Sequence, residues 1–222
     1  MLKDEFVSSF THELKTPVNS ILGFARLIKS SNCTEKEKDE YIEIIISEAE
    51  RLSKLSESIL LLTRLERSTE LNRVQRFNVS EQLRRVVVLL QSAWQEKKLE
   101  IDFDSEEIFI YGNPDLLEQA WINLVGNAIK FSPAGGKVYI RAQQTQDTVV
   151  ISFSDQGKGM DDDTVKHAFE CFYQGDSEYK SKGNGIGLSL VKKICELHGG
   201  SVCITKTDEK GTTFTVKLKI TN

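Results

Sequence analysis

The feature that most constrains the fold is a helical repeat of apolar residues near the start of the chain. The repeat has gaps of four and three residues and comprises Phe10, Leu14, Pro17, Ile21, Phe24 and Ile28. This spacing keeps the apolar side chains on one side of an α-helix over about five turns. Because such a stripe is stable only when another apolar surface covers it, the chain must begin with a helix that packs along a second element.

A second long helix follows the first. Thr34 and Glu37 have the spacing of a capping box, in which each side chain bonds the other residue's backbone N–H at the start of a helix. No glycine or proline interrupts residues 35–67. The apolar stripe of this second helix comprises Ile42, Ile45, Ala49, Leu52, Leu55, Ile59, Leu62 and Leu65. We therefore predict a helical hairpin over residues 1–68.

A hairpin of only two helices leaves part of its apolar surface in water. Pairing with a second copy would cover that surface and give a four-helix bundle about a two-fold axis, so we expect a homodimer. The alternative is that both stripes pack on the C-terminal part of the same chain.

The rest of the chain has the pattern of an α/β domain, which we place at residues 77–222 after a linker at 69–76. Helices are expected from Asn78 to about Lys97, from Asn113-Pro114 onward, and at about 186–197, with capping residues at the first two starts. Apolar runs and alternation predict strands at 100–103, 108–111, 137–144, 148–154, 201–206 and 212–220. We predict a mixed sheet covered on one face by helices.

Composition excludes several classes of protein. The formal net charge is −4 and the basic residues form no dense block, so we expect no nucleic-acid partner. The four cysteines have no metal-ligand spacing and are expected to be reduced thiols. No apolar run approaches the ~18 residues of a membrane span and no signal peptide opens the chain, so we expect a cytoplasmic fragment of a longer protein.

His12 lies two residues from both Phe10 and Leu14, so it must point away from the apolar stripe into solvent. Thr16 shares its face of the helix. Pro17 removes the N–H that would bond the Glu13 carbonyl, and so bends the helix beside His12. An exposed imidazole is mostly neutral at pH 7 and can act as a nucleophile whose proton a neighbouring carboxylate accepts. These features alone fit a reactive histidine and a solvated surface histidine equally well.

Three polar clusters stand out in the C-terminal part. Asn123, Asn127 and Lys130 form one ridge of a helix and offer amide oxygens for Mg²⁺ and a cation for phosphate, although an ordinary polar helix face has the same pattern. The segment 155–160 follows an apolar strand and carries Asp-x-Gly-x-Gly, which tight turns also use. The segment 183–188 opens a helix with Gly-x-Gly-x-Gly, where exposed N–H groups favour phosphate oxygens.

Taken together, these motifs resemble a known family. The stretch Phe10–Pro17 resembles, residue for residue, the phosphoacceptor box of sensor histidine kinases. The three C-terminal clusters resemble the asparagine box and the two glycine boxes of the ATP-binding domain of that family. The segments 169–172 and 211–214 resemble its phenylalanine box and its closing glycine segment. The resemblance covers essentially the whole chain and implies the α/β sandwich that these kinases share with gyrase, Hsp90 and MutL ATPases.

The resemblance also implies roles for individual residues. His12 would receive a phosphoryl group from ATP and pass it to an aspartate of a response regulator receiver domain. Glu13 would act as the base, and Thr16 would position a water when the same domain dephosphorylates the regulator. Asn127 would coordinate Mg²⁺, while Asn123 and Lys130 would serve the phosphates. Further residues would read adenine or shape the pocket and its lid: Asp155, Gly157, Gly159, Gly183, Gly185, Gly187 and Leu188.

The sequence departs from the family at one place. Many members carry an arginine shortly after the second phenylalanine of the phenylalanine box, where this chain has Tyr173-Gln174-Gly175. Lys180 and Lys182 could supply the missing charge on the γ-phosphate, although a lysine is a poorer clamp than a guanidinium. In such a protein a missing N-terminal sensor region could anchor the chain to a membrane.

Two other functions would use much of the same sequence. One is a conformational ATPase of the gyrase or Hsp90 type, which would need no exposed His12 followed by Glu13 and Thr16. The other is a degenerate dimeric scaffold that binds nucleotide poorly. The intact motifs around Asn127 and Asp155 favour a working nucleotide site over the scaffold.

Overall fold

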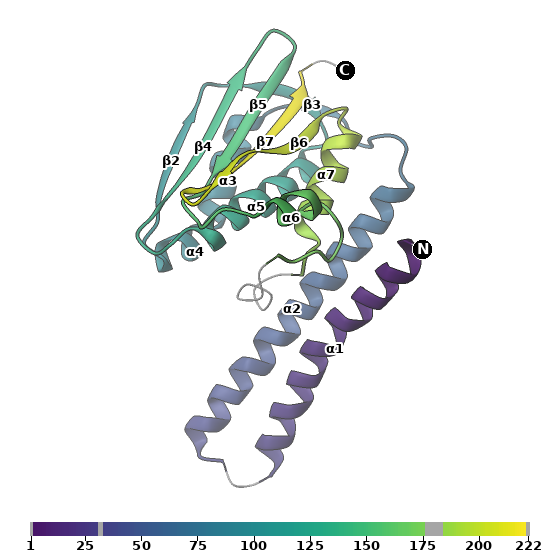
Figure 1. Ribbon diagram of the computed structural model, residues 1–222, viewed down its shortest axis with the longest axis vertical. Coiled ribbons are helices and arrows are strands. Elements are labelled where there is room, and N and C mark those ends of the chain that lie inside the picture. The colour runs from purple at the N-terminus through teal and green to yellow at the C-terminus, as the bar shows by residue number, and fades with distance from the viewer. Residues whose placement is uncertain (1, 31–32, 176–183, 221–222) are drawn as a thin grey trace.

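Two long helices precede an α/β sandwich in the computed structural model, which describes residues 2–30, 33–175 and 184–220 (Figure 1). Helix α1 spans Leu2–Lys29 and helix α2 spans Glu35–Arg67. The predicted capping box is present at the start of α2. The N–H of Glu37 donates to Oγ1 of Thr34 at 3.3 Å, and the N–H of Thr34 donates to Oε2 of Glu37 at 2.8 Å. The prediction of a helical hairpin is confirmed.

The two apolar stripes face each other along the hairpin, but one half of α2 is less covered than expected. On α1 the residues of the stripe are half-buried or buried. The ring centroid of Phe24 lies 5.3 Å from that of Tyr41 on α2. On α2, Leu55, Leu62 and Leu65 are buried. The expectation that Ile42 and Ala49 lie in the packed stripe is wrong for this single chain, where both are exposed. The N-terminal half of α2 meets only α1 in Figure 1, whereas its C-terminal half also packs on the sandwich.

The sandwich is built on a mixed sheet of five strands, in the order β2-β4-β5-β7-β6. These strands span Glu100–Ser105, Lys137–Gln144, Thr148–Ser154, Gly211–Lys219 and Ser201–Asp208, in that order. Strand β2 runs parallel to β4 and the other pairs are antiparallel. Alternate residues of β4 and β5 are buried, so one face of the sheet is the apolar face on which the helices pack. A small second sheet pairs β1 (Gln75–Asn78) with β3 (Phe109–Gly112).

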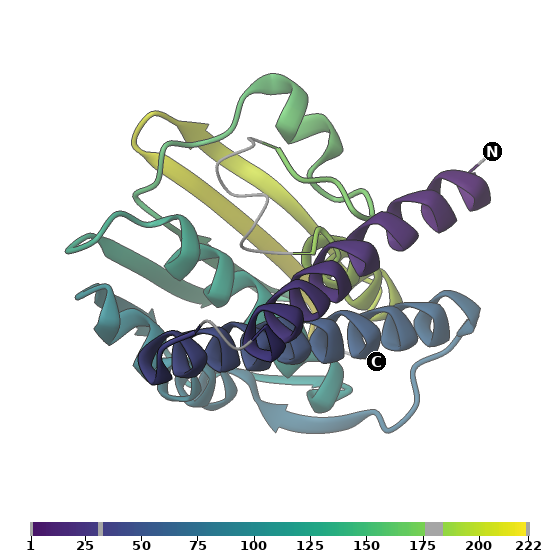
Figure 2. The same cartoon turned by 90° about the horizontal axis from the view of Figure 1, so that it is seen from below.

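Helices cover one face of the large sheet, as the two views show (Figures 1 and 2). They are α3 (Val79–Leu89), α5 (Pro114–Phe131) and α7 (Gly187–Leu197), with short helices α4 (Gln91–Glu96) and α6 (Asp162–His167) at the side. The predicted fold class, a helical hairpin followed by an α/β sandwich, is confirmed.

The helix expected from Asn78 to about Lys97 is in fact two helices. The chain leaves helical geometry at Leu90, with φ −93° and ψ 15°. The indole N–H of Trp94 donates to the carbonyl of Val87 at 3.0 Å, so α4 folds back against the last turn of α3. A side-chain hydrogen bond across the turn therefore accompanies the break.

The hairpin and the sandwich share one hydrophobic core. The buried leucines of α2 belong to the same cluster as Leu190 and Ile194 of α7, and Leu14 of α1 packs against it half-buried. Part of the alternative considered above therefore holds, because the C-terminal half of α2 packs on the sandwich together with Leu14 of α1. No helix within the described residues is both long and apolar enough to cross a membrane.

Candidate functional site

His12 lies on the exposed surface of α1, on the side away from the stripe that faces α2. Thr16, one turn later, is also exposed, and its hydroxyl donates to the carbonyl of His12 at 3.4 Å. Pro17 is buried in the stripe. The expected orientation of the imidazole therefore agrees with the structure, and the helix presents His12 to any group that approaches from solvent.

Glu13, beside His12, has a different environment. Its side chain is 22% exposed, and its Oε2 lies 3.5 Å from Nη2 of Arg51 on α2. The guanidinium of Arg51 also lies 3.7 Å from Oε2 of Glu48. The carboxylate next to the histidine is therefore held from the second helix of the hairpin, which leaves it fewer orientations than a free surface glutamate would have.

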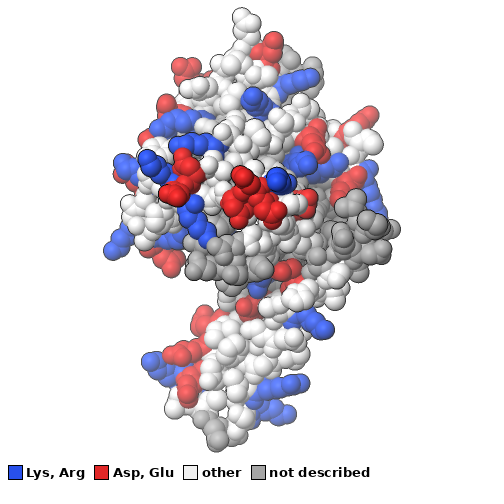
Figure 3. Space-filling model, in the orientation of Figure 1, with Lys and Arg blue, Asp and Glu red and all other residues white. Residues whose placement is uncertain are grey.

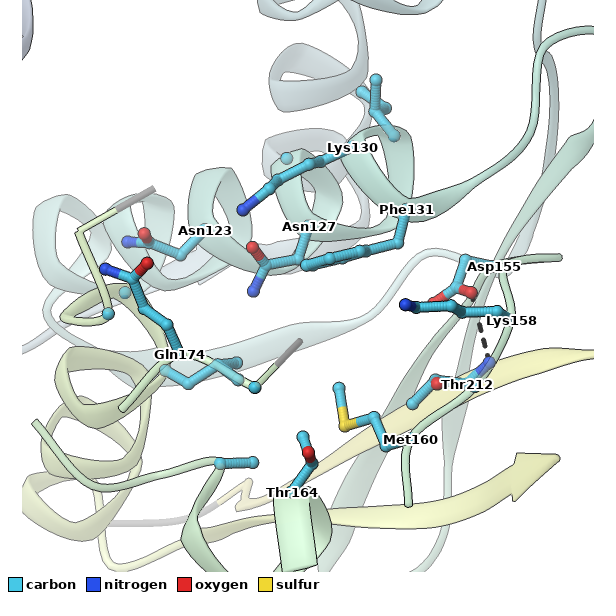
Figure 4. Close-up of a pocket in the computed structure, with 18 of the residues that line it drawn as sticks. Asn123, Asn127, Lys130, Phe131, Asp155, Lys158, Met160, Thr164, Gln174 and Thr212 are labelled. Carbon is cyan, nitrogen blue, oxygen red and sulfur yellow. Dashed lines mark hydrogen bonds between the residues drawn. The ribbon is translucent and has the colours of Figure 1, made fainter. Parts of the chain in front are cut away.

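A cavity of about 1460 Å³ opens between the end of the sheet, α5 and the loops that flank α6 and α7. Asn123, Asn127 and Lys130 project into it from α5, as the ridge in the sequence predicts (Figure 4). Asn123 is fixed by a hydrogen bond from its Nδ2 to the carbonyl of Gln119 at 2.8 Å. Two amides and one ammonium thus line the same side of the cavity.

Asp155 forms the opposite end of the cavity and is buried. Its Oδ1 accepts hydrogen bonds from the N–H groups of Gly157 at 2.8 Å and Thr212 at 3.2 Å, the latter drawn in Figure 4. Burial raises the pKa of the Asp155 carboxyl above its ordinary value, and these backbone N–H groups oppose the rise. A second carboxylate oxygen remains for a donor group within the cavity.

The glycines of the two boxes act mainly through close packing. Gly159, Gly185 and Gly187 line the cavity, as does Leu188. A Cβ on Gly187 would lie 2.6 Å from Oδ1 of Asn123, so a larger residue at the start of α7 would displace the Asn123 side chain. Gly157 does not itself line the cavity, but a Cβ there would meet the carbonyl of Phe131 at 2.7 Å.

Some expectations fall elsewhere or cannot be placed. Lys180, Lys182 and Gly183 lie outside the described residues. Phe131, the last residue of α5, also lines the cavity, and its ring lies 4.7 Å from Nζ of Lys130. The segment that lacks the family arginine does reach the cavity, through Tyr173, Gln174 and Gly175.

Sequence reasoning missed several lining residues. Lys158, Met160, Thr164 and Thr212 line the cavity beside the predicted positions (Figure 4). Lys54 of α2 lines it as well, and Arg51, one turn earlier, bonds Asn184 of the loop before α7. The position of Thr212 in the closing glycine segment could have indicated its role. Nothing local distinguishes Arg51 and Lys54 from other charged residues of a solvated helix.

The chemistry of the cavity also fits a magnesium ion that arrives with a nucleotide. Among the described residues there is no group of three or more His, Cys, Asp or Glu that could hold a metal. Mg²⁺ is often bound by one or two protein oxygens, with phosphate and water as the other ligands. The amide of Asn127, half-buried and directed into the cavity, offers one such oxygen.

Comparison with known families matches both parts of the chain. Residues 2–68 match the His Kinase A (phospho-acceptor) domain, and residues 112–222 match the histidine kinase-, DNA gyrase B-, and HSP90-like ATPase family. The chain is 34% identical over 218 residues to the heme sensor protein HssS of Staphylococcus saprophyticus. It is 33% identical over 218 residues to HssS of Staphylococcus aureus strain Newman. Each match covers 98% of this chain and 47% of the relative, so the chain spans about half the length of these relatives.

Solved structures have the same architecture. The structure of full-length ShkA in complex with AMPPNP has a TM-score of 0.72, is 27% identical, and is matched over 99% of this chain and 46% of that one. The histidine kinase ThkA in complex with the response regulator TrrA has a TM-score of 0.80 at 24% identity, over 97% of this chain and 61% of that one. The Acinetobacter baumannii histidine kinase AdeS has a TM-score of 0.79 at 23% identity, over 95% of this chain and 98% of that one. The last two likenesses establish the fold alone.

An exposed histidine in a matching phosphoacceptor hairpin and a polar cavity in a matching ATPase domain occur here in one chain. The chain therefore belongs to the sensor histidine kinases, and comprises the catalytic portion of such a protein.

Proposed function

We propose that the chain transfers the γ-phosphoryl group of ATP to His12 and then to an aspartate on the receiver domain of a response regulator. The observation that carries this proposal is the pairing of an exposed His12, flanked by Glu13, with a cavity lined by Asn123, Asn127 and Asp155. A conformational ATPase would use the cavity but would need neither the histidine nor the hairpin around it. The match of residues 2–68 to a phosphoacceptor domain supports the kinase over that alternative.

The chemistry needs little more than positioning and charge neutralisation. A nitrogen of the His12 imidazole would form a bond to the γ-phosphorus, and the bond from that phosphorus to the oxygen bridging to the β-phosphate would break. ADP would leave, and the carboxylate of Glu13 would accept the imidazole proton. In the second step the phosphoryl group would pass to a carboxylate oxygen of the regulator as its bond to the His12 nitrogen breaks. Glu13 would return its proton to the imidazole, which restores the neutral histidine.

Within the cavity each residue would have one task. Asp155 would accept a hydrogen bond from the adenine amino group through the oxygen that the backbone does not occupy. Asn123 and Lys130 would contact the phosphates, and Asn127 would hold a Mg²⁺ ion that neutralises phosphate charge. The likeness to ShkA, solved with AMPPNP, supports placing a nucleotide in this cavity.

Thr16 would serve a second reaction, the dephosphorylation of the regulator. Its hydroxyl lies on the exposed face of α1 that carries His12, where a docked receiver domain could be reached. The hydroxyl could orient a water for attack on the aspartyl phosphate, so one surface would serve transfer and removal.

We also infer that two copies associate through the hairpin. Large apolar side chains stay exposed along it, namely Val18, Leu22, Leu27, Ile42, Ile44, Ile46 and Leu60. Figure 3 shows uncharged surface on the hairpin between its acidic and basic side chains. A four-helix bundle would cover them with apolar surface of the second copy. Sedimentation equilibrium of the chain should give a dimer at micromolar concentration, and a monomer would contradict this part of the proposal.

Incubation with ATP labelled at the γ-position and Mg²⁺ tests the kinase proposal. The wild type should acquire a label that acid removes and base does not, and His12→Gln should acquire none. His167→Gln is the matched control because it removes another partly exposed histidine outside the hairpin, and it should label like the wild type. Equal labelling of His12→Gln and the wild type would contradict the proposal.

A further inference from the structure

We propose that Arg51 is a positioning residue that connects the nucleotide loop before α7 to Glu13, the carboxylate beside the phosphoacceptor histidine. The inference rests on the function proposed above and adds a residue to it. It concerns Asn184 and Gly185, which line the cavity. Helix α2 contacts Asn184 directly, and helix α1 is connected to Gly185 through Phe172.

The first connection runs through the guanidinium of Arg51. Its Nε donates to Oδ1 of Asn184 at 3.3 Å, and its Nη2 lies 3.5 Å from Oε2 of Glu13. Oε2 of Glu48, one turn earlier on α2, lies 3.7 Å from Nη1, at ion-pair distance. The side chains of Arg51 and Glu13 are each 22% exposed, so this contact lies in a partly desolvated interface where charge-assisted bonds are stronger than on open surface.

The second connection runs through Phe172 of the phenylalanine box. Its N–H donates to the carbonyl of Gly185 at 2.8 Å, and its ring lies 6.5 Å from the ring of Phe10 on α1. Phe172 has φ +64°, a left-handed conformation that a non-glycine residue keeps only when its surroundings enforce it. Asn184 is thus connected through Arg51 to Glu13, the residue after His12. Gly185 is connected through Phe172 to Phe10, two residues before His12.

The loop at 184–185 has little freedom to move alone. Gly185 has φ +65°, and a Cβ there would lie 2.6 Å from the backbone of Phe172. A nucleotide that draws the N–H groups at the start of α7 toward its phosphates would therefore shift Asn184 and Phe172 together. Since Arg51 bonds both Asn184 and Glu13, that shift would reach the carboxylate next to His12.

Arginine suits this position for a geometric reason. The planar guanidinium presents Nε, Nη1 and Nη2 in fixed directions, so one side chain can hold an amide and two carboxylates at once. The ion pair uses Oε2 of Glu13, so Oε1 is the oxygen that could receive a proton from the imidazole. Restricting the rotamers of Glu13 before the reaction lowers the entropy cost of reaching a reactive geometry.

Autophosphorylation kinetics of Arg51 variants test the inference. Arg51→Gln should lower kcat by about 10- to 100-fold, since misplacing a general base forfeits much of its effect. The KM for ATP should stay within about threefold, because Arg51 does not itself line the cavity. Arg51→Lys should fall close to Arg51→Gln, because an ammonium cannot bond Asn184 and Glu13 in the same fixed fork. Arg64→Gln, at an exposed position of the same helix, is the matched control and should keep the wild-type kcat.

A double-mutant cycle with Asn184→Ala separates this connection from general damage to the fold. Measured at saturating ATP, Asn184→Ala should lower kcat by about as much as Arg51→Gln does. The kcat of the double variant should lie within about twofold of the kcat of the slower single variant. The inference would be overturned if the loss of kcat in the double variant equalled the product of the two single losses. An unchanged or increased kcat in Arg51→Gln would also overturn it. Labelling of the wild type at His12 reports on the proposed function itself, so its absence would overturn both.

Discussion

Asp155 and Thr212 exchange two hydrogen bonds beside the cavity, where strand β5 ends and strand β7 begins. The N–H of Asp155 donates to the carbonyl of Thr212 at 3.0 Å, and Oδ1 of Asp155 accepts from the N–H of Thr212 at 3.2 Å. Together with the N–H of Gly157, this pairing fixes which carboxylate oxygen faces the backbone and which one faces the cavity. The backbone thereby orients Asp155 for a donor such as the adenine amino group.

Asp155→Asn should weaken nucleotide binding by about 10- to 100-fold, the effect of losing a hydrogen bond to a charged acceptor. In the variant the amide oxygen would keep the two backbone N–H groups, and the amide nitrogen would face the adenine amino group, donor against donor. A fluorescence or calorimetric titration with ADP would measure this loss. Asp104→Asn, an exposed carboxylate on β2, is the control and should bind like the wild type. Equal affinity in Asp155→Asn would show that this residue does not read the base.

His198 gives the fold a dependence on pH. Its Nδ1 bonds the carbonyl of Ile194 at 2.7 Å, and its Nε2 accepts from the N–H of Asn113 at 3.0 Å, so the ring must be neutral to make both bonds. Burial lowers the pKa of His198 below its ordinary value. A depressed histidine pKa means that the unfolded chain binds the proton more readily, so the stabilising contribution is present above pH ~6.5 and is lost as pH falls toward the lower folded-state pKa.

We therefore expect the free energy of unfolding, measured by urea denaturation, to decrease between pH 7.5 and pH 5.5 by more in the wild type than in His198→Gln. His167→Gln controls for general effects, because that ring also bonds the carbonyl four residues earlier but lies at a more exposed position. It should retain the wild-type pH dependence. If the free energy of unfolding of His198→Gln depended on pH as strongly as that of the wild type, His198 would not be the source of the pH dependence.

Lys97 caps the C-terminal end of α5, the helix that carries Asn123 and Asn127. Its Nζ donates to the carbonyls of Ile129, Lys130 and Ser132 at 2.9, 2.6 and 2.9 Å. A cation at this end of a helix is favoured by the helix dipole as well as by the hydrogen bonds. Lys97→Ala should lower the free energy of unfolding by about 1–3 kcal/mol.

The measurement is chemical denaturation of Lys97→Ala beside Lys192→Ala, which removes an exposed lysine from α7. The second variant should change stability by no more than about 0.5 kcal/mol. If Lys97→Ala lowered the free energy of unfolding no more than Lys192→Ala does, the Lys97 cap would not contribute to the stability of α5.

The local rules of the sequence accounted for most of the fold. Thr34, Asn78 and Asn113 cap the helices that their spacing indicates, and the side chain of each accepts from the N–H three residues later. Helix α6 is absent from the sequence expectations although Asp161 caps it, because six residues are too few to show a helical period. The break at Leu90 is accompanied by the hydrogen bond of the Trp94 indole to Val87, which no local pattern predicts. The predicted domain limits at residues 68 and 77 stay predictions.

The site divides in the same way. The polar ridge of α5 and the glycines of the two boxes could be found from order and spacing, since each belongs to one short segment. Arg51 could not, because its partner Asn184 is 133 residues away and the contact exists only once the hairpin packs on the sandwich. The roles assigned to the site residues remain predictions until they are measured.

The most direct test of the whole account is to map the phosphate after brief incubation with Mg²⁺ and ATP. Residues 4–15 form a tryptic peptide in which His12 is the only histidine, and the chain holds only two others, His167 and His198. Mass spectrometry under basic conditions, with fragmentation that retains the phosphate, should place it on His12 of this peptide. Phosphate on Ser8, Ser9 or Thr11, on either of the other histidines, or nowhere in a nucleotide-bound chain would contradict the central claim.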